Sequence, residues 1–191
     1  MEEEMVQPDD AFKMVYPFDV PGIRAEMERM LNKPKCAAFV KQLLSIVASN
    51  AQADNKLVAG GDVLKVFDTV MSQKGLVRAN DIQNGADPSG PNLALGNVAK
   101  KNARIQVGNY RPGIPVTRAD LKVQYLKSDA RICLHETLHH CGELVYSDQE
   151  FAIAASALNG NNPPLPVPIP NTDMRFIYSQ YWDGELRKSY K

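Results

Sequence analysis

The sequence has no excess of charge of either sign, because 22 Lys and Arg residues balance 22 Asp and Glu residues over 191 positions. The basic residues are also scattered along the chain, so nothing in the sequence favours nucleic acid or an anionic membrane as a partner. No apolar run approaches the roughly 20 residues that a membrane-spanning helix needs. No secretory hydrophobic region follows the acidic start MEEEM, which leaves a removed signal peptide or a larger parent protein as open alternatives.

Cysteine is also scarce, with only Cys36, Cys133 and Cys141 in the chain. If one helix spans 133 to 141, its two cysteines lie about 12 Å apart along the helix axis. That separation is beyond the reach of a disulfide. Only Cys36 could pair with one of them, and three small buried thiols are an equal alternative. Cysteine usage therefore leaves the cellular compartment undecided.

The chain length suits one compact domain over 1–191. Apolar spacing and turn residues predict helices over 22–31, from Pro34 onward, over 62–73, over 128–141, from Ser147 onward, and over 172–190. Alternating apolar residues predict short strands at 76–79, 103–108 and 120–126. We expect an extended arm over 1–20 and a proline-rich strap over 159–171. The predicted class is α+β, with helices packed on a small mixed sheet.

Histidine is also scarce, and all three copies fall within the stretch LHETLHHCG at 134–142. His135 and His139 form an H-E-x-x-H motif with Glu136. Side chains four apart lie on one face of a helix, so both imidazoles can reach a single zinc ion at about 2.0 Å. Glu136 lies roughly 100° round the helix and would act as a general base on a water molecule that the metal activates. His140 points away from this ion and is expected to be an outer or surface residue.

The third metal ligand is expected to be Asp148. Glu143 would continue the line of ligands on one helix, where three side chains cannot converge tetrahedrally. Gly142 instead allows the chain to turn back, and Asp148 is then the first acid in the opening turn of the next helix. Glu150 is the reserve candidate, although it is the natural partner of Ser147 in a capping box. A plain first-turn aspartate favoured by the helix dipole is the alternative for Asp148.

The H-E-x-x-H pattern is short and also occurs by chance in ordinary helices. However, these polar residues lie among Ile132, Leu134 and Leu138. A histidine–glutamate group embedded in an apolar helix is costly unless a ligand satisfies it. The context therefore favours a metal site over coincidence.

The stretch HETLHHCG resembles the active-site helix of the zincin metallopeptidases, including the position of Gly142. The third histidine of the metzincin pattern is absent, because Val145 occupies its position. The continuation YSDQEFAIAASALNG is more similar to small bacterial zincin-like domains, some of which end large repeat-bearing surface proteins and carry a cysteine in an early helix, here Cys36. A secreted or cell-surface location is accordingly favoured over a cytoplasmic one.

The resemblance implies a sheet edge that binds substrate as an added strand, for which RIQVG at 104–108 or KVQYL at 122–126 is the candidate. Tyr110 and Tyr146 are conceivable oxyanion stabilisers, although packing tyrosines are the more ordinary interpretation.

The expected function is a zinc-dependent metallopeptidase that hydrolyses a peptide or protein substrate with Glu136 as general base. One alternative is a zinc-binding domain without turnover. Another is an interaction module that uses the proline-rich segment 163–170, with the histidine helix as part of the core.

Overall fold

The computed structural model describes residues 5–6, 18–50, 62–72, 75–79, 104–108, 116–141, 146–160 and 174–191. Its helices are α2 (Val20–Leu31), α3 (Pro34–Asn50), α4 (Val63–Ser72), α5 (Arg118–His139), α6 (Asp148–Leu158) and α7 (Met174–Tyr190). Its strands are β1 (Met5–Val6), β2 (Gly75–Ala79), β3 (Arg104–Gly108) and β4 (Val116–Thr117). None of the helices in these ranges combines the length and the apolarity required to cross a bilayer.

The predicted α+β class is wrong, because helices dominate the described residues and place them in the all-α class. The few extended residues form two separate pairs, β1 antiparallel to β4 and β2 parallel to β3, instead of one mixed sheet. The run at 120–126 that was expected to be a strand lies inside α5. Its Leu, Lys and Gln residues have good helix propensity, and a helix extends readily once its first turn has formed.

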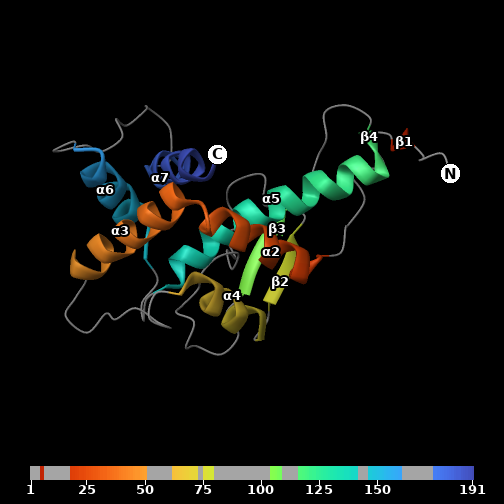
Figure 1. The fold of residues 1–191 in the computed structure, drawn as a ribbon, viewed down its shortest axis with the longest axis horizontal. Coiled ribbons are helices and arrows are strands. Elements are labelled where there is room, and N and C mark those ends of the chain that lie inside the picture. Colours follow the sequence, from red (N-terminus) through yellow and green to blue (C-terminus); the bar gives the residue numbers. More distant parts are fainter. Residues whose placement is uncertain are drawn as a thin grey trace.

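Helix α5 is the longest helix of the described residues, and its N-terminal end extends away from the other helices toward β4 (Figure 1). It packs against α2 and α4, while α3 and α7 each pack against α6 and against one another. One continuous core joins these helices, and its largest fully buried side chains include Trp182, Phe67, Phe151 and Leu138. The C-terminal half of α5 thus lies inside the protein, which is where the H-E-x-x-H motif is located.

Two predicted helix starts agree closely with the structure, whereas α5 begins ten residues before its predicted start at 128. Pro34 opens α3, and α6 begins after Ser147, which forms the expected capping box with Glu150. The side-chain oxygen of Ser147 accepts from the Glu150 backbone N–H at 3.2 Å, and the Glu150 carboxylate accepts from the Ser147 N–H at 3.2 Å. Helix α2 starts at Val20, inside the range predicted as an extended arm. Residues 1–4 and 7–17 of that arm and residues 161–171 of the strap lie outside the described residues.

Candidate metal centre

The histidine–carboxylate site consists of His135, Glu136 and His139 from α5 and Asp148 from α6. The apolar neighbours Leu134 and Leu138 are fully buried in the core. This packing fixes the rotation of α5 and turns both histidines toward α6 and α7. The ring of His135 stacks on Trp182 of α7 at 4.1 Å between centroids, and the ring of His139 lies 5.3 Å from that of Phe151 of α6.

One carboxylate oxygen of Asp148 lies close to the Nε2 atoms of both histidines. Asp148 Oδ1 lies 3.1 Å from His139 Nε2 and 3.7 Å from His135 Nε2. The capping box explains this placement, because it starts α6 at Ser147 and leaves Asp148 as the first helical residue. The sequence-predicted ligands His135, His139 and Asp148 are thus brought together by the fold. One ligand atom each from His135, Glu136 and His139 also lie within 4.8 Å of one another.

Both imidazole rings are held by their Nδ1 atoms. His139 Nδ1 lies 2.5 Å from the backbone carbonyl oxygen of Tyr146, and His135 Nδ1 lies 3.0 Å from Asp183 Oδ1. A carbonyl and an ionised carboxylate can only accept, so each Nδ1 carries a proton and donates. When Nε2 carries no proton, each ring therefore presents the lone pair of that nitrogen to the common point near Asp148. Metal-binding histidines in proteins are oriented by the same kind of outer hydrogen bond.

Helix α7 supplies two residues of the site that were not identified from the sequence. Trp182 Nε1 donates to Asp148 Oδ1 at 2.9 Å, so the indole fixes the carboxylate as well as stacking on His135. Asp183 accepts from His135 and also forms an ion pair with Arg187 at 2.8 Å. Asp148 and His135 lie 34 and 48 positions before Trp182 and Asp183, so only the tertiary packing of α7 brings these pairs together.

Glu136 lies beside the two histidines, with Oε1 3.9 Å from His135 Nε2. It is buried, and among the described residues its Oε2 atom has no hydrogen-bond partner. Burial raises the pKa of the Glu136 carboxyl, although the nearby histidines oppose that shift. A buried carboxylate oxygen without a partner is costly. A cation, or a water molecule next to one, would satisfy it.

Protonation of His139 is coupled to Asp148. Burial lowers the pKa of His139, but the hydrogen bond to Asp148 and the charge of Glu136 outweigh burial and raise the pKa to about 9. Burial raises the pKa of Asp148, and the bond to His139 reverses this and lowers it below its ordinary value of 3.8. Without a cation the pair is thus an imidazolium and a carboxylate, so a metal ion must displace the proton on His139 Nε2.

The site reaches solvent at Asp148, whose side chain is 26% exposed, compared with 8% for His139. A substrate group could approach the ligands from this side. The side chain of Glu150 is exposed and engaged in the capping box. Glu143 and Tyr110 lie outside the described residues.

The remaining residues singled out from the sequence do not join the site. His140 is fully buried, which excludes the surface alternative, and burial lowers its pKa to about 4. Tyr146 is fully buried against Phe151, and its hydroxyl group has no partner among the described residues. Cys36, Cys133 and Cys141 are all free, buried thiols, so the alternative without a disulfide is confirmed.

No protein-family model, curated protein or solved structure matches the chain. Proposals about its function consequently depend on the geometry of the site itself.

Proposed function

We propose that this protein is a zinc-dependent metallopeptidase in which His135, His139 and Asp148 hold the metal and Glu136 is the general base. The observation that carries the proposal is the orientation of the two imidazole rings. Each Nδ1–H is held by an oxygen atom, and each Nε2 points to the same carboxylate oxygen. A structural role for the histidines would not require both Nε2 atoms to face one carboxylate oxygen.

The donor set supports zinc as the ion. Two imidazole nitrogens and one carboxylate oxygen would make the three-ligand set of catalytic zinc sites, which leaves a further position for substrate or water. Calcium and magnesium prefer sites built from oxygen atoms alone. The orphaned Oε2 atom of Glu136 fits a site that holds a cation. When bound, zinc supplies the Lewis acidity that makes a water molecule acidic near neutral pH.

Glu136 is suited to accept the proton of the attacking water. It neighbours both histidines, and it is the one carboxylate of the site without a hydrogen bond to Trp182, Arg187 or either histidine among the described residues. After attack on the peptide carbonyl carbon, the protonated Glu136 can pass this proton to the leaving amine. Asp148 and Asp183 are not suited to this role. Asp148 is itself a proposed metal ligand and accepts a hydrogen bond from Trp182, and Asp183 accepts one from the proposed ligand His135.

The variant Glu136→Gln tests the proposal. It keeps the shape and hydrogen-bonding capacity of the side chain and removes the base, so zinc binding and folding should persist. Hydrolysis of an unfolded protein substrate should fall by a factor on the order of 10² to 10⁴, the usual contribution of a general base. Glu28→Gln is the matched control, because it makes the same charge change at an exposed position on α2.

Three outcomes separate the alternatives. Glu136→Gln with full activity would show that Glu136 is not the base. Loss of zinc from this variant would show a role as ligand. A parent protein that binds zinc and leaves all peptide substrates intact would instead support a zinc-binding domain without turnover.

A further inference from the structure

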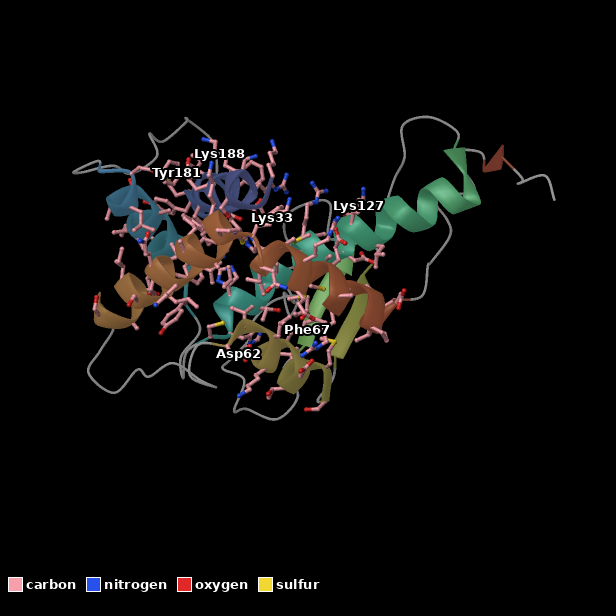
Figure 2. The ribbon with its side chains drawn as sticks, in the orientation of Figure 1. Lys33, Asp62, Phe67, Lys127, Tyr181 and Lys188 are labelled. Atoms are coloured by element: carbon pink, nitrogen blue, oxygen red, sulfur yellow. The ribbon has the colours of Figure 1, made fainter. Side chains whose placement is uncertain are left out.

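A second candidate site lies between α2 and α5, in a cavity of about 520 Å³. We call it the α2–α5 pocket. Four cationic side chains line it, together with Tyr190 of α7 and a single acid, Glu26: the cations are Arg29, Lys33, Lys127 and Arg131. Figure 2 labels Lys33 and Lys127, which come from the α2 and α5 sides of the pocket. The pocket contains none of the residues of the histidine–carboxylate site.

The concentration of positive charge here is unusual for this chain. The whole sequence is balanced at 22 cationic and 22 acidic residues, and the basic residues are scattered along it. The fold nevertheless gathers four of them, from α2 and the turn after it and from α5, more than ninety positions apart in the chain. Glu26 neutralises Arg29 through an ion pair. Within the described ranges, Lys33, Lys127 and Arg131 have no ion-pair partner.

The pairs within the pocket also repel one another. Lys127 and Arg131 lie four positions apart on α5, where like charges destabilise a helix. Arg29 lies in the last turn of α2 and Lys33 in the turn that follows it, where the helix dipole offsets part of the repulsion. Lys127 and Arg131 lie in the middle of α5 and have no such compensation. An anion bound between the two helices would attract the cations on both sides and offset their mutual repulsion.

We propose that the α2–α5 pocket binds a phosphate group carried by a small organic molecule or a lipid headgroup. Arginine matches phosphate oxygens with two parallel N–H donors, and lysine adds charge. The volume lies within the range of small-molecule sites, which is roughly 300–1,000 Å³, and leaves space for an organic body beyond the phosphate. Tyr190 is suited to donate a further hydrogen bond, because burial raises the pKa of its phenol to about 12. This proposal stands apart from the proposed hydrolysis.

The test measures binding of inorganic phosphate to the full chain by isothermal titration at low salt. The parent should bind phosphate saturably. Lys127→Gln combined with Arg131→Gln should weaken binding by about tenfold or more, because two charge-assisted contacts are lost. The control combines Lys41→Gln with Lys65→Gln, two exposed positions on α3 and α4 that give the same change in net charge. The control should bind phosphate like the parent.

Folding of the pocket variant is a second expectation. Removing two repelling cations should leave its melting temperature without phosphate at or above that of the parent. If the double variant nevertheless fails to fold, Arg131→Lys replaces it, since this change keeps the charge and removes the two-donor contact. That variant should bind phosphate several-fold more weakly.

The source of the phosphate is distinguished with vesicles that contain phosphatidic acid. Association that inorganic phosphate displaces assigns the group to a lipid, whereas phosphate binding without vesicle association assigns it to a soluble phosphate ester. The proposal is overturned if the parent does not bind phosphate saturably, or if the pocket and control variants weaken binding equally. It is also overturned if His139→Ala abolishes binding while the pocket variant leaves it unchanged, because phosphate would then bind at the metal centre.

Discussion

Replacing Asp183 tests whether α7 helps to build the metal centre. Its carboxylate accepts from His135 Nδ1 at 3.0 Å and thereby holds the opposite nitrogen toward Asp148. Loss of such an outer partner typically costs about 10- to 100-fold in metal affinity, or about 1.4–2.7 kcal/mol. Asp183→Asn keeps an acceptor oxygen and loses the charge, so we expect the lower end, about tenfold. Asp183→Ala leaves Nδ1 without a protein acceptor, so we expect the upper end, about a hundredfold.

The assay is competition for zinc between the protein and a chromophoric chelator at constant pH. Asp68→Asn is the matched control: it also removes a carboxylate that is paired with an arginine, but that pair, with Arg24, is at the surface between α2 and α4. The control should retain the affinity of the parent. Equal zinc affinity in the parent and in Asp183→Ala would refute the role of Asp183, provided that Asp148→Ala in the same assay loses zinc.

Further predictions concern the indole, the proton and the packing of the motif helix. Trp182→Phe keeps a ring on His135 and loses the hydrogen bond to Asp148, so zinc affinity by chelator competition should fall several-fold; an unchanged value would mean that the indole only packs. The pKa of His139 is raised from 6.5 to about 9, so its contribution to the stability of the metal-free protein is complete below pH 6.5 and is lost as the pH rises through about 9. Zinc affinity should increase over this same window, and zinc titrations in two buffers of different ionisation enthalpy should show release of about one proton near pH 7.5; no release would contradict the assignment of an imidazolium. Leu138→Ala removes a fully buried side chain beside the motif and should lower the free energy of unfolding in urea by about 2–5 kcal/mol, with a loss below 1 kcal/mol indicating a loosely packed site.

Short-range sequence patterns were sufficient to predict how several residues of the candidate site are placed. The i, i+4 spacing of His135 and His139 predicts one helix face because helical geometry leaves no other arrangement. The S-x-x-E pattern at Ser147 predicts where α6 begins, and the position of Asp148 follows from that start. These features depend on neighbours in the sequence, so the sequence alone was enough to place them.

Features that depend on long-range packing were not predictable in the same way. Trp182 and Asp183 contact residues that are 34 and 48 positions earlier in the chain, and nothing near them in the sequence marks them as site residues. The α+β prediction failed for a related reason. Alternating apolar residues at 120–126 suit a strand, but this segment is continuous with the motif helix and extends it back to Arg118.

The central claim is that the convergent histidines and Asp148 hold one zinc ion, and elemental analysis tests it most directly. Protein purified without added metal should contain about one zinc per chain, and Asp148→Ala and His139→Ala should each lose most of it. Glu136→Gln should retain it. A parent protein that contains no zinc, or contains another metal instead, and whose melting temperature is unchanged by zinc or by a chelator, would contradict the account.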